Sequence, residues 1–220
     1  MQITKDIELV EGARGANVYF ISSEDGAILV DSGLPGSGAR LLRFLSERPA
    51  VKLKYIVLTH ADPDHIGGAA AVKKATGASV AIGREDAPAL AGEKPSKALK
   101  GPLGPFFRVV FGVAVRVQHV KADLILDDGD NIGGFQVIAV PGHTDGSLAL
   151  WRPQDRVLIS GDALLTDRRG AERAPRQGAA GDYAQALESA AALGQLGYRY
   201  LLPGHGRPRV VSDLASREGR

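Results

Sequence analysis

The feature that most constrains this chain is the segment 59–68, Thr-His-Ala-Asp-Pro-Asp-His-Ile-Gly-Gly, which places two histidines and two aspartates within six consecutive positions. The preceding residues 55–59 are apolar or β-branched and predict a buried strand, whereas Pro63 and the two glycines indicate that regular structure ends there. Imidazole and carboxylate groups at this density are typical of a metal site. We therefore expect metal ligands on a loop at the carboxyl end of a strand; turn residues with two incidental histidines are the alternative.

The absence of cysteine limits the chemistry that such a site can use. It excludes disulfides, thiolate nucleophiles, and zinc or iron–sulfur sites ligated by cysteine. Histidine and carboxylate side chains remain as the strong metal ligands of this chain. Any metal bound here therefore has nitrogen and oxygen ligands.

The charge of the chain is nearly balanced, with a formal net charge of +2 and with basic and acidic residues dispersed along it. This balance gives no electrostatic basis for binding nucleic acid. The first residues lack the cationic and apolar pattern of a secretion signal, and no stretch reaches the roughly 20 apolar residues that a membrane span requires. We expect a cytoplasmic protein whose partner is a small-molecule substrate rather than nucleic acid or membrane. Its oligomeric state stays open, with a homodimer as one option.

The length of 220 residues and the hydrophobic content of 44% predict a single domain that spans residues 1–220. Strand patterns dominate both ends of the chain, and helix patterns lie between them. The predicted helices begin after Gly38 and cover 67–76 and 182–196, and the predicted strands cover 3–10, 17–22, 27–31, 55–59, 79–82, 122–126, 135–140, 147–151, 156–160 and 198–202.

Residues 84–118 interrupt this pattern with a mixture of proline, glycine, lysine and alanine, followed by an apolar run. We interpret this segment as an insertion or a lid. Its aromatic residues Phe106, Phe107 and Phe111 either pack onto the main body or line a substrate pocket.

Three further motifs each follow a predicted strand and supply a metal-ligating residue type. They contain His143 in Pro-Gly-His-Thr-Asp-Gly, Asp162 in Ser-Gly-Asp-Ala, and His205 in Pro-Gly-His-Gly. Loops at one edge of a sheet sandwich can bring such separate residues together into a preorganised site. The fifth histidine, His119, belongs to none of these motifs, and we expect it to be a structural or surface residue.

In the order of these motifs the chain resembles the metallo-β-lactamase-fold hydrolase superfamily over nearly its whole length, most of all the glyoxalase II and lactonase branches. The sequence Leu-Val-Asp-Ser-Gly at 29–33 is similar to an early aspartate motif of the family, and residues 60–65 are similar to its main metal motif. The resemblance implies a four-layer αββα sandwich, an α/β fold with two mixed sheets face to face and helices outside. It also implies that Asp31 is a buried support for the ligand loop rather than a ligand.

The resemblance further implies a dinuclear centre with two divalent metal ions. One metal would be held by His60, Asp62 and His143, the second by Asp64, His65 and His205, and Asp162 would bridge them.

One position departs from the family pattern, because Asp62 stands where a second histidine of His-x-His-x-Asp-His is usual. The added carboxylate lowers the positive charge of the site, so bound water should be less acidic. It also shifts the metal preference from zinc, which the resemblance implies, towards iron or manganese. Aspartate is shorter than histidine, and a mononuclear site that uses the second-metal ligands is therefore an alternative.

The function implied by the resemblance is that of an enzyme, a metallo-hydrolase in which a metal-bound hydroxide attacks an ester, thioester, lactone or related bond while Asp64 orients the nucleophile. Few residues follow Pro208, so we expect no room for the helical glutathione-binding extension of true glyoxalase II. Two alternatives are a di-iron oxidoreductase related to flavodiiron proteins, which have a carboxylate at the position of Asp62, and a non-catalytic metal-binding scaffold.

Overall fold

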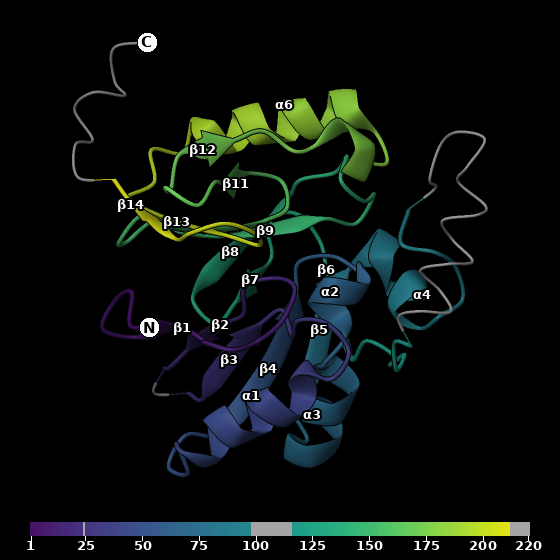
Figure 1. Ribbon diagram of the computed structural model, residues 1–220, viewed down its shortest axis with the longest axis vertical. Coiled ribbons are helices and arrows are strands. Elements are labelled where there is room, and N and C mark those ends of the chain that lie inside the picture. The colour runs from purple at the N-terminus through teal and green to yellow at the C-terminus, as the bar shows by residue number, and fades with distance from the viewer. Residues whose placement is uncertain (24, 98–115, 212–220) are drawn as a thin grey trace.

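The computed structural model describes residues 1–23, 25–97 and 116–211. Two six-stranded mixed β-sheets lie face to face, and helices cover the outer face of each (Figure 1). This arrangement confirms the predicted αββα sandwich. The N-terminal part of the chain forms one sheet with its helices, and the C-terminal part forms the other.

The first sheet combines an antiparallel edge with a parallel centre. Strands β1 to β3 pair antiparallel, and β3 to β6 pair parallel. Parallel neighbours need crossover connections, which the helices supply. In spatial order the strands are β1 (Ile7–Leu9), β2 (Tyr19–Ile21), β3 (Ala27–Val30), β4 (Leu53–Leu58), β5 (Ser79–Gly83) and β6 (Leu124–Leu126).

The helices of this half follow the strands that they connect. Helix α1 (Ser37–Ser46) joins β3 to β4 and buries Leu41 and Phe44. Between β4 and β5 lie α2 (Pro63–Ile66) and α3 (Ala69–Thr76), and α3 ends at Gly77, whose φ of 71° suits glycine. After β5 come the 3₁₀-helix η1 (Arg84–Asp86) and α4 (Ala87–Leu90).

The second sheet is antiparallel except for the pair β10 and β13. Helix α6 (Tyr183–Gly194) covers its outer face (Figure 1) and is capped by Asp182, whose carboxylate accepts a hydrogen bond from the backbone N–H of Gln185. In spatial order the strands are β14 (Arg209–Val210), β13 (Tyr200–Pro203), β10 (Val157–Gly161), β9 (Leu148–Arg152), β8 (Phe135–Ala139) and β7 (Asn131–Ile132). The separate hairpin of β11 (Leu165–Thr166) and β12 (Glu172–Arg173) and the 3₁₀-helix η2 (Gln177–Ala179) precede α6.

The hydrophobic core has three layers because successive side chains of a strand point to opposite faces. In β4, Ile56 and Leu58 pack under α1 and α3, whereas Val57 faces the second sheet. In β10, Ile159 faces the first sheet and Leu158 packs under α6. Each fully buried side chain of this kind contributes roughly 1.5–3 kcal/mol.

The prediction that regular structure ends at Pro63 is wrong. Pro63 begins helix α2, and the backbone N–H groups of His65 and Ile66 donate to the carbonyl of Asp62. Proline suits the first turn of a helix because its φ is preset and its missing N–H would have no helical partner there. Two of the predicted ligands, Asp64 and His65, therefore lie on a helical turn rather than on a loop.

The predicted lid at 84–118 falls partly outside the described residues, and Phe106, Phe107 and Phe111 lie entirely outside them. The described part contains η1, α4 and an irregular stretch up to residue 97. In the parts of the chain that the structure describes, no helix combines the length and the apolar character needed to cross a membrane.

Candidate metal centre

All seven predicted ligands meet at one edge of the sandwich. Strands β8, β10 and β13 run in the same direction, so the loops that follow them emerge together and carry His143, Asp162 and His205. The first sheet contributes the residues that follow β4. These are His60, Asp62, Asp64 and His65.

The first set of donors consists of His60, Asp62 and His143, whose ligand atoms lie within 4.8 Å of one another. Oδ2 of Asp62 is 3.0 Å from Nε2 of His143 and 3.6 Å from Nε2 of His60. All three residues are buried. The structure therefore groups these residues as the resemblance predicts.

The second set consists of Asp64, His65 and His205, again within 4.8 Å. Oδ2 of Asp64 is 3.2 Å from Nε2 of His205. Asp162 lies between the two sets, because its Oδ2 is 3.6 Å from Nε2 of His143 and 3.5 Å from Nε2 of His205. This position is the one that a bridging carboxylate would need.

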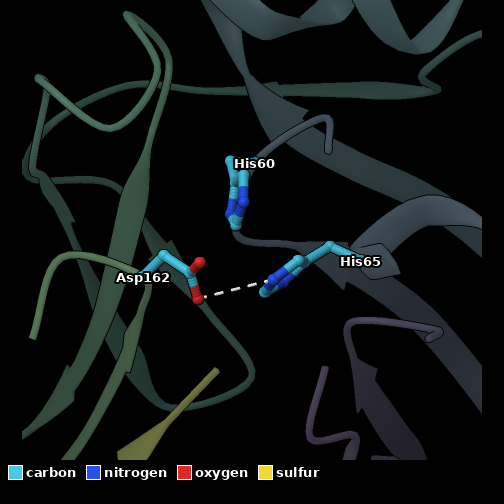
Figure 2. A group of neighbouring side chains, drawn as sticks. All are labelled: His60, His65 and Asp162. Atoms are coloured by element: carbon cyan, nitrogen blue, oxygen red, sulfur yellow. Dashed lines mark ion pairs between the residues drawn. The ribbon is translucent and has the colours of Figure 1, made fainter. Parts of the chain in front are cut away.

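Three buried donor atoms at the middle of the centre form no hydrogen bond within the described residues: Nε2 of His60, Nε2 of His65 and Oδ1 of Asp162. Figure 2 shows both imidazoles directed towards the Asp162 carboxylate, whose Oδ1 is 3.4 Å from Nε2 of His65. Buried polar atoms are rarely left unsatisfied. Two ligands each about 2.1 Å from an ion are separated by about 3.0 to 3.4 Å at octahedral or tetrahedral angles. The donor set therefore fits a divalent metal ion in atom type, spacing and unmet bonding capacity.

Asp31, at the end of β3, supports these ligands from behind. Its Oδ1 accepts a hydrogen bond from the backbone N–H of Thr59 at 2.8 Å, and its Oδ2 is 2.8 Å from Nδ1 of His65. An ionised carboxylate only accepts, so in the neutral imidazole Nδ1 carries the proton and Nε2 of His65 has the lone pair that a metal would use. The backbone φ of Asp31 is 61°, a region that aspartate tolerates better than most residues. Asp31 is thus placed as a support, as the resemblance implies.

The hydroxyl of Thr59 extends the same network to the other imidazole. Its Oγ1 is 2.9 Å from Oδ2 of Asp31 and 3.1 Å from Nδ1 of His60. Donation to Asp31 leaves Oγ1 free to accept from Nδ1 of His60, and Nε2 of His60 then keeps its lone pair as well. One threonine and one aspartate therefore orient two imidazoles.

Asp86 is a supporting residue that the sequence reasoning missed. Its Oδ2 accepts hydrogen bonds from the N–H of Ala61 at 2.7 Å and from Oγ1 of Thr144 at 2.9 Å, and its Oδ1 accepts from the N–H of Gly146 at 3.1 Å. It thereby ties the ligand loop after β4 to the ligand loop after β8. Burial raises the pKa of Asp86, and these hydrogen bonds offset only part of the rise. Its place after β5, at the edge where the other ligands gather, was the available signal.

The loop that carries His205 is held by Tyr19 in β2 and by Asn17, which lies just before that strand. The side-chain amide of Asn17 donates to the carbonyl oxygens of Pro203 and Gly206, both at 2.9 Å. The buried hydroxyl of Tyr19 donates to the same Pro203 carbonyl at 2.7 Å. These bonds fix the end of β13 against the first sheet.

Ser96 and Lys97 also reach the centre, and no sequence motif marks either of them. Oγ of Ser96 donates to Oδ1 of Asp62 at 2.6 Å. Nζ of Lys97 lies 2.5 Å from Oδ2 of Asp62 and 2.9 Å from Nε2 of His143. Burial raises the pKa of Asp62, but its close contacts with His143 and His60 and the charge of Lys97 outweigh burial and hold the pKa well below its usual range.

The electrostatics of the centre favour a cation. Burial raises the pKa of Asp162, but the charge of the nearby His65 and of the other imidazoles outweighs burial and holds the pKa far below its usual range. Burial lowers the pKa of His65, but the carboxylates of Asp31 and Asp162 outweigh it and raise the pKa well above its usual value. The carboxylates therefore stay ionised and attract positive charge.

His119 lies outside the centre, with Nδ1 3.2 Å from the carbonyl oxygen of Leu90.

The fold and the site together define a class of protein. The family model of the metallo-beta-lactamase superfamily matches residues 12–205, and the chain belongs to this superfamily. Membership indicates a metal-dependent hydrolase.

Among curated proteins, the chain is 31% identical over 239 residues to "Probable metallo-hydrolase YflN" of Bacillus subtilis (strain 168), which covers 95% of this chain and 89% of that protein. It is 34% identical over 138 residues to a "Hydroxyacylglutathione hydrolase" of Pseudomonas putida (strain W619). The second match covers 60% of this chain but only 41% of the relative.

Solved structures with the same fold include "BLEG-1 B3 metallo-beta-lactamase", with a TM-score of 0.70, 26% identity and 93% of each chain covered. They also include "TTHA1623 in a di-iron-bound form", with a TM-score of 0.67, 26% identity and 89% of each chain covered. Both likenesses extend over most of the sandwich.

Proposed function

We propose that this protein hydrolyses an ester, thioester or lactone bond in a small molecule with the help of a divalent metal ion. The observation that carries the proposal is the group of buried, unbonded donor atoms on His60, His65 and Asp162. Their unmet bonding capacity is costly in a folded protein unless a ligand compensates for it. The family relationship supports the same general chemistry.

Six of the seven donors form two sets of three, with Asp162 between them, and we propose that Asp64, His65 and His205 hold the ion that hydrolysis needs. A divalent ion bound there would acidify a water molecule and polarise the bond to be cleaved. Burial raises the pKa of Asp64, but the hydrogen bond from His205 and the nearby imidazoles outweigh it and lower the pKa. Asp64 is therefore an ionised acceptor that can hold and orient the attacking water. No serine or cysteine nucleophile is required.

A thioester is the first substrate class to test, because several relatives are named hydroxyacylglutathione hydrolases. The chain spans less than half the length of those relatives, so their whole activity is not transferred to it. Simple thioesters and lactones are the closest chemical alternatives. For the ion, zinc is our first proposal, and the carboxylate of Asp62 makes iron and manganese the next candidates.

The test is turnover of a panel of thioesters, lactones, carboxylic esters and phosphodiesters by protein loaded with zinc, iron or manganese. We expect His65→Ala to lower the turnover of any accepted substrate by more than about 100-fold, because it removes a ligand. His119→Ala is the matched control, since His119 lies outside the centre, and it should retain activity. Full activity in His65→Ala would refute the proposal, and loss of activity in that variant alone would exclude a non-catalytic scaffold.

A second candidate function is a di-iron oxidoreductase. It is favoured by Asp62, which adds a third carboxylate to the centre beside Asp64 and Asp162, and by the structural likeness to a protein solved in a di-iron-bound form. Elemental analysis of protein grown with iron, zinc and manganese all present decides between the two functions. Absence of redox-active iron would remove this candidate.

A further inference from the structure

The side chain of Lys97 lies inside the first donor set rather than at its rim. Its ammonium is 2.5 Å from Oδ2 of Asp62 and 2.9 Å from Nε2 of His143, and only 13% of the side chain is exposed. Ser96, the neighbouring residue, donates to Oδ1 of Asp62. Two of the three donors of the first set thus already contact a cation.

The contact with His143 competes directly with metal binding. A neutral imidazole offers a single lone pair on its unprotonated nitrogen. When Nε2 of His143 accepts from Lys97, that lone pair is not available to an ion. Nε2 of His143 and Oδ2 of Asp62 are only 3.0 Å apart, so a metal that used both atoms would also meet the positive charge of Lys97 at close range.

The same cation accounts for the unusual carboxylate in the first set. The family pattern usually has a histidine at the position of Asp62, and a neutral imidazole would be a poorer partner for an ammonium than a carboxylate. Asp62 gives Lys97 a charged acceptor, while Ser96 saturates the other oxygen. The departure from the pattern and the part-buried lysine are therefore the two members of one ion pair.

The second set differs from the first because no hydrogen bond or ion pair to Lys97 reaches its donors in the described structure. Nε2 of His60 in the first set, Nε2 of His65 in the second set and Oδ1 of Asp162 form no hydrogen bond in the described structure. The contacts of the second set run to Asp162 and between its own members, as in the pair of His205 and Asp64. It therefore retains its capacity for a metal.

We propose that the ammonium of Lys97 takes the place of the first metal ion, so that the native protein binds one divalent ion, at Asp64, His65 and His205. The inference rests on the proposed metal-dependent function and specifies how many ions that function uses. Lys97 then acts as a positioning and selecting residue that sets the metal stoichiometry.

The experiment is a calorimetric titration of chelator-treated protein with zinc, combined with elemental analysis after removal of free metal. Native protein should bind one ion per chain. Lys97→Met keeps the length of the side chain but removes its charge, and it should bind two. Lys94→Met is the matched control, because Lys94 is exposed on the same segment, and it should bind one. Asp62→His combined with Lys97→Met should bind two ions, with at least tenfold tighter binding at the first set.

Two tightly bound ions in native protein would overturn the inference, and so would a single ion in both variants that lack Lys97. Binding of the ion at the second set shows that a variant is folded, and Lys97→Gln replaces Lys97→Met if that binding is lost. The titration uses no substrate, so its outcome is separate from that of the hydrolase proposal. One ion without turnover would refute only the hydrolase, and turnover with two ions would refute only the role of Lys97.

Discussion

At the scale of single residues, the geometry of the centre depends on residues outside the seven candidate ligands. Asp31, Thr59 and Asp86 each hold a ligand or a ligand loop through hydrogen bonds that are buried. Such supporting bonds fix the tautomer and direction of an imidazole before an ion arrives. Their removal should weaken metal binding without removing any ligand.

Replacement of Asp31 tests this support at His65. In Asp31→Asn one acceptor oxygen becomes an amide donor, so the N–H of Thr59 and Nδ1 of His65 compete for the remaining oxygen. We expect metal affinity to fall by roughly 10- to 100-fold, measured by competition with a chromogenic chelator. Asp31→Ala should be worse, because alanine tolerates the φ of 61° less well than asparagine. Unchanged affinity in both variants would show that the support is dispensable.

Replacement of Asp86 tests the tie between two ligand loops. In Asp86→Asn an amide NH₂ group replaces one carboxylate oxygen. This donor then faces another donor, either the backbone N–H of Gly146 or the two groups on Ala61 and Thr144, and the hydrogen bond there is lost. We expect a loss of about 1–3 kcal/mol in the free energy of unfolding and weaker metal binding. Asp145→Asn is the control in the same loop, since Asp145 is exposed. Equal stability of the two variants would contradict this role.

Sequence patterns indicated the seven candidate donors because each follows a strand or lies in one dense motif, and the structure brings all seven together. They missed Asp86, Ser96 and Lys97 for a physical reason. Each of these acts through a contact with a residue distant in the sequence, such as the 35-residue separation of Lys97 from Asp62. A side chain of this kind has no local signature, because its role exists only once the chain is folded.

At the scale of elements, the close packing of strand ends limits what the sequence can tolerate. A Cβ atom added at Gly83, the last residue of β5, would lie 2.2 Å from the carbonyl oxygen of Gly146 in the ligand loop after β8. Backbone on both sides leaves neither group room to move. The contact between β5 and the loop that carries His143 therefore leaves no room for a side chain at Gly83.

Gly83→Ala should lower the free energy of unfolding by about 1–3 kcal/mol through overpacking and should weaken metal binding by displacing the ligand loop. Thermal denaturation with and without metal measures both effects. Gly178→Ala is the control, because a Cβ there would meet nothing within 4 Å. A variant as stable as the control would mean that this contact relaxes freely.

The strands were predictable as elements because apolar runs flanked by glycine and proline mark them, and their order along the chain then follows. Helix α2 was not, since a four-residue helix has too little periodicity to distinguish it from a turn. The hairpin of β11 and β12 has only two residues in each strand and lies in a polar stretch. Short elements such as these are determined by their tertiary surroundings.

An ion pair between Asp6, just before β1, and Arg152 joins the two sheets. Nη1 of Arg152, at the end of β9, donates to Oδ2 of Asp6 at 2.6 Å. Burial raises the pKa of Asp6, but the hydrogen bonds from Arg152 and Thr4 outweigh it and lower the pKa. The folded protein therefore binds a proton at Asp6 less readily than the unfolded chain does.

Asp6→Asn should cost less than about 1 kcal/mol near neutral pH, because solvent screens a partly exposed pair. The sign follows from the lowered pKa: the stabilisation is present above the unfolded pKa of about 3.9 and disappears as the pH falls through the folded value. Urea denaturation of both proteins between pH 7 and pH 3 should show the difference shrinking. Glu188→Gln, at an exposed position of α6, should show no such trend, and a constant difference for Asp6→Asn would refute the assignment.

At the scale of the whole molecule, the centre joins two halves that each form one sheet with its own helices (Figure 1). His65 belongs to the first half, and Asp162 and His205 belong to the second. An ion held by all three would resist separation of the sheets. Metal binding and global stability should therefore be linked.

Saturation with metal at a hundred times its dissociation constant should stabilise the fold by about 2.7 kcal/mol, which corresponds to a rise in Tm of about 5–10 °C. Differential scanning fluorimetry measures the rise, and a chelator should reverse it. His65→Ala should lose the shift and His119→Ala should keep it. A shift that survives in His65→Ala would place the stabilising ion elsewhere.

The distribution of ligands along the chain also sets an order in time. His65 lies on α2, early in the chain, whereas His205 follows β13, which must first pair with β10. Domains are synthesised from the N-terminus at a finite rate, so the second set stays incomplete on the ribosome until nearly all of the described sandwich has been made. Uptake of the ion is consequently a late step in the life of each molecule, and a chain that has acquired its metal has already assembled both sheets.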